Sequence, residues 1–519
     1  MSDSRSANNK RIAKNTMLLY VRMLFLVAVN LYTSRIVLEA LGVADFGIYN
    51  VVGGVVAMFA LISGSISAAI SRYVTYELGT GRKERLELIF STSINILLII
   101  AGVIVVLAET VGLWFLNVKM VFPPGRLAAA NWVFQLSILT FVINLISLPY
   151  NASIISHEKM SAFAYISILE AVGKLGIAFL IMLSVPDRLV FYAMLMCVLA
   201  IVIRIVYMRY CRDHFAECRY RFVLDRPLLK EMFCFAGWNF IGAGSAMLRD
   251  QGGNIVINLF YGTMVNAACG IAVQVNNAIT GFVTNFMTAL NPQITKSYAS
   301  GDREYMMTLI FNGARLSFYM LLLVSLPVLL NTRYLLSLWL TVVPEYSTLF
   351  VQLILLFAMS ESVSTPLITA TLATGNIRNY QLIVGGLQML NLPVVYVLLR
   401  NGFAPQWVYI VAIIISQACL AARLVLLRGM IGLDVRRYMT NVYLNVISVG
   451  VCAMIIPACV RMALPENFVN FVTVSLVSLV CTALSIYYVG CTRAQRAFVM
   501  EKCRKIARDR GLLRKDIQK

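Results

Sequence analysis

Fourteen long apolar stretches decide what this chain can fold into. Each has about 20 or more mostly apolar residues, which is the length that an α-helix needs to cross a lipid bilayer. They lie at roughly 15–38, 49–71, 89–116, 129–156, 161–184, 189–208, 233–261, 266–292, 309–332, 347–373, 380–399, 407–427, 441–461 and 469–490. Because 60% of the 519 residues are apolar and only 13% are charged, a water-soluble core could not hide them. We predict an all-α integral membrane protein with about 14 transmembrane helices.

Basic residues are unevenly divided between the two sides that these spans define. If both termini are cytoplasmic, the cytoplasmic segments hold 31 of the 44 Lys and Arg, and the outer loops hold six. This is the bias of the positive-inside rule, and it explains the net charge of +20 without a nucleic-acid partner. The longest loop has about two dozen residues, so no extramembrane catalytic domain fits. We therefore expect a multi-pass protein that is not an enzyme, with both termini cytoplasmic.

The sequence also contains an internal repeat with an offset of about 220 residues. The segment 79–84 (GTGRKE) corresponds to 299–304 (ASGDRE), and Pro149 corresponds to Pro366 at an offset of 217. The sequence thus predicts two parallel six-helix lobes followed by two C-terminal helices outside the repeat, and transporters with such paired halves bind substrate where the halves meet. The predicted divisions are a cytoplasmic N-tail (1–14), an N-lobe (15–208), an inter-lobe loop (209–232), a C-lobe (233–427), two further spans (441–490) and a basic cytoplasmic C-tail (491–519). The C-tail is expected to lie on the anionic membrane surface.

Polar residues form stripes on three of the predicted spans. At 100° per residue, the stripe of 266–292 occupies one helical face within about 60°. Interhelical hydrogen bonds and a water-filled cavity both explain such stripes, and the cavity is favoured where five or six residues are continuous. The residues predicted to line it are Asn144, Asn254, Asn258, Gln274, Asn277, Thr284 and Thr288.

Arginines within the spans indicate an anionic substrate. Arg22 lies about two turns inside the first span, and Arg249 lies near the middle of the seventh. Because a guanidinium group binds phosphate in a bidentate manner, we predict that both bind substrate. Four other arginines are expected to extend to the membrane interface, namely Arg35, Arg204, Arg315 and Arg423.

Intramembrane acids are candidates for coupling to H⁺ or Na⁺. Asp250 and Arg249 are each expected to need another partner or water, because adjacent side chains diverge on a helix. Glu361 could bind a coupling ion or pair with an arginine, and both interpretations stay open. Glu170 and Lys174 are spaced to neutralise each other.

Neither a metal site nor another cofactor is expected. The chain has two histidines and eleven cysteines, and no CxxC or CxxH spacing occurs. Most cysteines fall in apolar runs, where they act as small buried side chains.

Several segments resemble the polysaccharide-export branch of the multidrug/oligosaccharidyl-lipid/polysaccharide superfamily, which includes the Wzx-type flippases. They are LGVADFGIYNVVGG (41–54), PYNASIISHEKMSAFAYISILEA (149–171), FAGWN (235–239), GTMVNAACGIAVQVNNAI (262–279) and PQITKSYASGDRE (292–304). The resemblance implies a MATE-like V of two lobes in the bacterial cytoplasmic membrane. It also implies that an undecaprenyl-diphosphate-linked oligosaccharide moves from the inner to the outer leaflet by alternating access. The expected partners are membrane lipids, this glycan lipid, a coupling ion, and the proteins that polymerise and export the glycan.

Two other functions compete with the flippase. A cation-coupled multidrug exporter of the same fold usually has an acid in its first helix, where this chain has Arg22. A glycan polymerase or ligase would need a large outer loop, which this chain lacks. The lipid II flippases also have an arginine in helix eight, whereas the eighth span here has no charged residue.

Overall fold

The computed structural model describes residues 2–57, 59–120, 125–182, 187–223, 225–340, 343–492, 495–497 and 500. This part of the chain is helical and contains no strand. Eleven of its helices are long and apolar enough to cross a membrane. The three other expected spans, 49–71, 233–261 and 266–292, fall on helices α1, α2 and α7. The predicted C-tail lies almost entirely outside the described residues.

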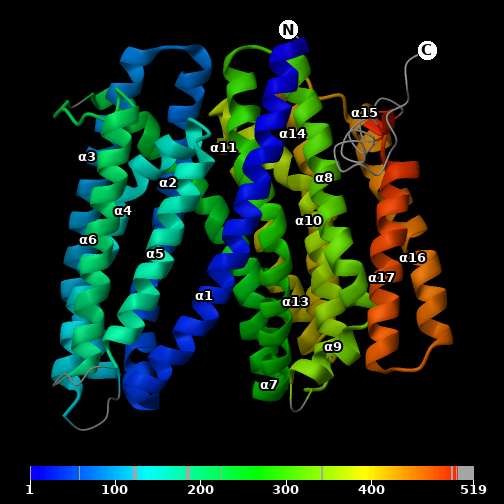
Figure 1. The fold of residues 1–519 in the computed structure, drawn as a ribbon, viewed down its shortest axis with the longest axis horizontal. Coiled ribbons are helices and arrows are strands. Elements are labelled where there is room, and N and C mark those ends of the chain that lie inside the picture. Colours follow the sequence, from blue (N-terminus) through cyan, green and yellow to red (C-terminus); the bar gives the residue numbers. More distant parts are fainter. Residues whose placement is uncertain are drawn as a thin grey trace, which may run out of the picture. The chain divides into compact units, whose positions relative to one another are not determined.

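The first half of the sequence forms helices α1 to α6. Their bounds are α1 (Ser2–Ala57), α2 (Ala60–Thr80), α3 (Lys83–Leu107), α4 (Leu127–Ser156), α5 (Met160–Leu180) and α6 (Arg188–His214). Two π-helical turns, Ala108–Gly112 and Phe115–Lys119, follow α3. Helices α3, α4, α5 and α6 run side by side (Figure 1).

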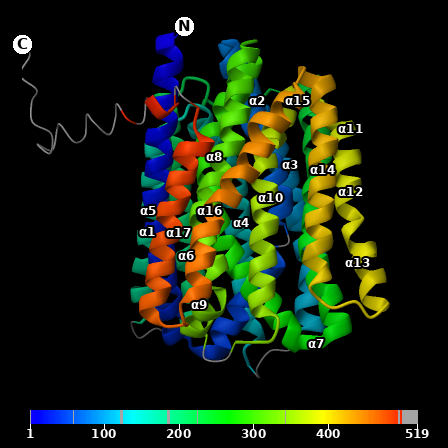
Figure 2. The same cartoon turned by 90° about the vertical axis from the view of Figure 1, so that its right-hand side faces the viewer.

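The second half begins with the 74-residue helix α7 (Arg226–Ala299). The remaining helices are α8 (Arg303–Leu330), α9 (Thr332–Trp339), α10 (Ser347–Thr374), α11 (Arg378–Tyr380), α12 (Gly386–Met389), α13 (Asn391–Arg400), α14 (Trp407–Ile431), α15 (Val435–Tyr438), α16 (Asn445–Ala463) and α17 (Phe468–Ser485). π-Helical turns at Gln381–Gly385 and Met439–Leu444 join α11 to α12 and α15 to α16, and a third, Ile486–Gly490, follows α17. Helices α16 and α17 pack against each other along their length (Figure 2).

Left-handed backbone positions recur at the offset of the sequence repeat. Gly42 (φ 77°) breaks α1, and Gly262 (φ 74°), 220 residues later, breaks α7 in the same way. Only glycine adopts this conformation without steric cost, which explains why each break occurs at a glycine. Gly81 and Gly301 form a second pair at the same offset. The repeat found in the sequence is therefore also present in the backbone.

The chain divides into two compact units. The first comprises 1–252, 284–310 and 366–390, and the second comprises 253–283, 311–365 and 391–519. The first unit thus combines helices α1–α6 with parts of α7, α8 and α10–α12. In the second unit, α16 exposes Ile447, Val451, Met454 and Ile455, as expected of a helix that faces lipid.

Candidate functional site

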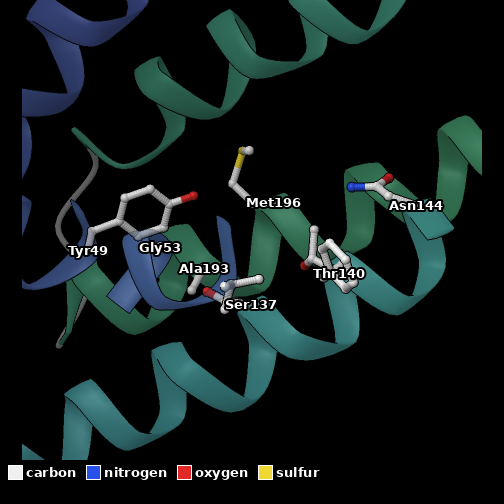
Figure 3. A pocket seen from close by; sticks show the side chains of 9 residues that line it. Tyr49, Gly53, Ser137, Thr140, Asn144, Ala193 and Met196 are labelled. Atoms are coloured by element: carbon white, nitrogen blue, oxygen red, sulfur yellow. The ribbon is translucent and has the colours of Figure 1, made fainter. Parts of the chain in front are cut away.

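A cavity of about 240 Å³ lies among helices α1, α4 and α6 of the first unit. Its lining combines apolar with polar side chains and is formed by Tyr49, Gly53, Val56, Ser137, Thr140, Phe141, Asn144, Ala193 and Met196. The Tyr49 hydroxyl and the Asn144 amide point toward the space between them from opposite sides (Figure 3). The volume is just below the usual range of small-molecule sites, about 300–1,000 Å³.

The polar lining comes from the stripe of the fourth span. Ser137, Thr140 and Asn144 are spaced three and four residues apart on α4, so one helical face presents all three. Thr140 donates a hydrogen bond to the Leu136 carbonyl at 2.8 Å, which fixes its hydroxyl on its own helix. Asn144, which the sequence predicted to line a cavity, is exposed and lies in the lining of this one.

Helix α7 shows an inverted pattern between residues 265 and 292. Its exposed positions are polar or small, and they include Gln274, Asn277 and Thr284. Its large apolar side chains face the packed side, where Phe286 and Met287 are buried. None of the described large apolar residues in this segment is among the exposed ones, in contrast to α16. A lipid-facing helix would expose apolar side chains, so this face is suited to contact with water.

The other predicted lining residues of α7 are less uniform. Asn258 is exposed, and Asn254 is partly buried. Thr288 is partly buried and donates to the Thr284 carbonyl at 2.8 Å. Asn291, next in the stripe, accepts a hydrogen bond from Thr369 of α10 at 2.8 Å. The stripe therefore includes some hydrogen bonds that hold the helices, as well as exposed polar groups.

Arg22 lies in an aromatic environment within the first unit. Its guanidinium carbon is 4.3 Å from the ring centroid of Phe163 on α5. Its Nε is buried and makes no hydrogen bond to the described residues. The residue as a whole is partly buried, and its guanidinium carries two further nitrogens of a type that donates to anions.

Arg249 and Asp250 form an ion pair with each other. The Arg249 Nε lies 2.8 Å from the Asp250 Oδ1, so the expectation that these neighbouring side chains diverge was wrong. The arginine side chain is long enough to fold back to the adjacent carboxylate. The Asp250 side chain is 53% exposed, whereas that of Arg249 is 9% exposed. The carboxylate is therefore the more accessible member of the pair.

Glu361 is surrounded by polar groups of the second unit. Its carboxylate accepts a hydrogen bond from Ser416 at 2.6 Å and lies 3.7 Å from the Arg423 guanidinium. Of the two interpretations of Glu361, the structure therefore bears out a partnership with an arginine. Tyr443, which precedes α16, donates to the Gln417 side chain at 2.8 Å, and Gln417 in turn donates to Ser360 at 2.5 Å.

Two arginines that were expected to extend to the membrane interface are buried instead. Arg423 is 1% exposed and Arg315 is 9% exposed. Arg315 donates to the Asn312 side chain at 2.7 Å and to the Gly490 carbonyl at 3.4 Å. Polar partners within the helix bundle therefore replace the water that a snorkelling side chain would reach. The predicted pair Glu170–Lys174 is confirmed at 2.6 Å.

Sequence analysis missed a buried carboxylate, Glu158, in the turn between α4 and α5. Its side chain is fully buried and receives Arg11, Gln293 and Lys296 at 2.6–2.7 Å. The partners are more than 130 residues away in the sequence, so no local pattern could reveal them. The sequence signal at this position is a difference between the two repeats. Glu158 aligns with Gly375 at the same offset of 217 residues that relates Pro149 to Pro366.

Solved structures of membrane transporters share the fold of this chain. Three solved structures are similar to the chain: a MATE in the bent conformation (TM-score 0.72, 12% identity, 83% of this chain and 97% of that one), an outward-facing multidrug resistance MATE family transporter of the MOP superfamily (0.70, 13%, 83% and 97%), and a MOP superfamily transporter from Pyrococcus furiosus (0.68, 13%, 82% and 96%). The last is described as having a binding pocket of reverse polarity. The chain therefore has the MATE fold.

The family is given by the sequence itself. The profile of the polysaccharide biosynthesis protein family matches residues 12–298, which is more than half of the chain. The chain belongs to this family, as its resemblance to the polysaccharide-export branch predicted. No curated protein matches it.

Proposed function

We propose that this protein is a flippase that moves an undecaprenyl-diphosphate-linked oligosaccharide from the inner to the outer leaflet of the bacterial cytoplasmic membrane by alternating access. One observation carries the proposal: the exposed face of α7 between residues 265 and 292 presents polar and small residues and none of the described large apolar ones, although the segment is long enough to span a bilayer. A glycan needs such a path, because its hydroxyl groups lose hydrogen bonds to water unless amides and hydroxyls replace them. Membership in the polysaccharide biosynthesis family agrees with a glycan as the cargo.

The proposed roles follow from the chemistry of each group. Gln274 and Asn277 donate to and accept from sugar hydroxyls along the exposed face. Arg22 binds the diphosphate, because its guanidinium lies over an aromatic ring and its buried Nε has no acceptor among the described residues. Arg249 contributes less, since Asp250 already neutralises it. The isoprenoid chain stays in the lipid throughout.

Ion coupling is assigned to Asp250 in preference to Glu361. The Asp250 side chain is more exposed, at 53% against 22%, so H⁺ or Na⁺ can reach it more easily. Glu361 is held by Ser416 and Arg423, and protonation there would leave the buried arginine without its counter-charge.

The test is complementation of cells that lack the gene. We expect the deletion to accumulate a complete lipid-diphosphate-linked repeat unit, measured by mass spectrometry, and to lose the surface glycan. Gln274→Leu and Asn277→Leu should restore transport poorly at normal protein level. The matched control is Ser448→Leu, an exposed polar residue of α16 whose neighbours are apolar, and it should complement fully. Full transport by both α7 variants would refute the role of the polar face.

A multidrug exporter is the second candidate, favoured by the likeness of the fold to multidrug MATE transporters. It predicts unchanged lipid intermediates, an intact surface glycan and increased drug sensitivity in the deletion strain. The same experiment therefore separates the two functions. Under the flippase proposal, proteins that polymerise and export the glycan act on the product at the outer leaflet.

A further inference from the structure

Glu158 lies at the centre of a buried polar network in the first unit. Its Oε2 accepts from the Arg11 Nε at 2.7 Å and from the Gln293 Nε2 at 2.6 Å, and its Oε1 lies 2.7 Å from the Lys296 Nζ. The Asn15 amide also donates to its backbone carbonyl at 3.3 Å. Arg11 and Asn15 belong to α1, whereas Gln293 and Lys296 belong to the end of α7. One side chain thus binds elements of both sequence repeats.

The backbone at Glu158 is unfavourable for a glutamate. Its φ is +58°, in the left-handed region, and its repeat counterpart Gly375 has φ +78°. A non-glycine residue in this region costs of order 1 kcal/mol, and glycine would avoid that cost. The surrounding contacts hold the glutamate in place in spite of this strain, which is the behaviour expected of a functional position.

The same end of the unit brings the two repeats together at equivalent positions. A Cβ on Gly79 of α2 would lie 2.7 Å from the Cβ of Ala299 in α7, and these residues are 220 positions apart. The turn after α10 is also engaged, since the Arg72 side chain of α2 donates to the Ala373 carbonyl at 3.4 Å and would collide with a Cβ on Gly375. The turns at 158 and 375 therefore each contact the other repeat, but only the first contributes a charge.

An apolar layer lies directly behind the Glu158 network. Leu19, Met160 and Ala289, from α1, α5 and α7, are fully buried in one cluster, with Phe163 packed against it. Leu19 is one helical turn beyond Asn15, and Arg22 is almost one turn beyond Leu19. The order along α1 is therefore an ionic layer, an apolar layer and then the candidate substrate arginine.

We propose that Glu158 is the positioning residue of a gate that closes the path at this end of the protein, by pairing with Arg11 and Lys296. The carboxylate draws the end of α7 onto the α4–α5 turn, and the apolar layer behind it excludes water. Opening requires Lys296 and Gln293 to leave Glu158, which exposes Arg22 to this side of the membrane. Because the charge count predicts this side to be cytoplasmic, the gate controls entry from the inner leaflet.

The neighbouring residue supplies a matched control. His157 pairs with Glu217 of the loop after α6 at 2.5 Å, and its ring stacks on Phe215 with 4.1 Å between ring centroids. This pair joins the same turn to the first repeat only. Glu217→Gln therefore removes a carboxylate that contacts the same turn without touching α7, whereas Glu158→Gln removes the bridge between the repeats.

The experiment measures how often the gate opens in the full-length protein. Ala289 is fully buried in the apolar layer and lies one helical turn before Gln293, so Ala289→Cys places a thiol behind the closed contact. Its modification by N-ethylmaleimide is followed by mass spectrometry of the peptide that contains position 289, so the native cysteines can stay. We expect Glu158→Gln to accelerate labelling by at least about tenfold, which corresponds to about 1.4 kcal/mol. Glu217→Gln should change the rate by less than about twofold.

A charge exchange distinguishes a gate from general loosening of the fold. Lys296→Glu should label rapidly, and the triple variant Lys296→Glu, Glu158→Lys and Arg11→Glu should return toward the slow rate, because both ion pairs are rebuilt with opposite polarity. Unchanged labelling in Glu158→Gln, equal acceleration by Glu217→Gln, or no rescue in the triple variant would each overturn the proposal. None of these outcomes depends on the substrate, so a failure of the flippase assignment is detected separately by the glycan measurements.

Discussion

Replacement of Gly79 by alanine tests whether the close approach of α2 and α7 is a real constraint. An added Cβ at this position would lie 2.7 Å from the Cβ of Ala299 and 2.9 Å from the Lys296 carbonyl oxygen. The carbonyl oxygen is part of the backbone of α7 and the Cβ is bonded directly to that backbone, so neither atom can move unless the helix moves. Overpacking of this kind costs about 1–3 kcal/mol. Against that cost stands the usual gain of about 0.5–1 kcal/mol when alanine replaces glycine in a helix.

The matched variant is Gly64→Ala on the same helix. A Cβ added at Gly64 has no atom within 4 Å, so this variant should gain the stability of alanine in a helix without any overpacking. The difference between the free energies of unfolding of the two variants, measured by SDS titration and circular dichroism in detergent, should therefore equal the overpacking term, about 1–3 kcal/mol. Ala299→Gly combined with Gly79→Ala should recover part of it. If Gly79→Ala is as stable as Gly64→Ala, the helices do not approach as described and the reasoning is refuted.

Two further predictions concern buried and paired charges. Arg423→Met leaves Glu361 without its counter-charge and should destabilise the protein by about 3–5 kcal/mol, whereas Arg35→Met, at an exposed position, should cost less than about 1 kcal/mol in the same unfolding assay. Burial alone would raise the pKa of Glu217, but the hydrogen bond and charge of His157 lower it below the usual 4.5. A depressed carboxyl pKa gives stability that is present above pH 4.5 and lost as the pH falls through the lowered value. The thermal midpoint should therefore drop less between about pH 6 and about pH 3.5 in Glu217→Gln than in the parent protein; an equal drop would contradict the shift.

Local patterns predicted the fold and part of the site. Apolar length defines the spans, and the periodicity of 100° per residue predicted a polar stripe on α7, of which Gln274, Asn277 and Thr284 are exposed. The i, i+4 pair Glu170–Lys174 was also accessible, because both residues share one helix.

The remaining part of the site depends on contacts that no local pattern contains. Glu158 meets Lys296 across 138 residues, and the pairing of Glu361 with Arg423 joins α10 to α14. The rotation of each helix about its axis decides such contacts, and tertiary packing sets it. Arg423 was misjudged for this reason, since its depth in the span was known but the face it occupies was not.

The difference between Glu158 and Gly375 has a consequence for the symmetry of the molecule. A homodimer built from one six-helix repeat would carry the same residue at both turns, and two glutamates or two glycines would make the two sides of its gate equal. Fusion of the repeats into one chain removes this constraint, because each copy can change alone. One copy keeps the relaxed backbone of a glycine, while the other accepts strain in return for a charge. In a duplicated chain, the two equivalent turns of the gate can therefore differ in charge, which is impossible in a symmetric assembly of identical subunits.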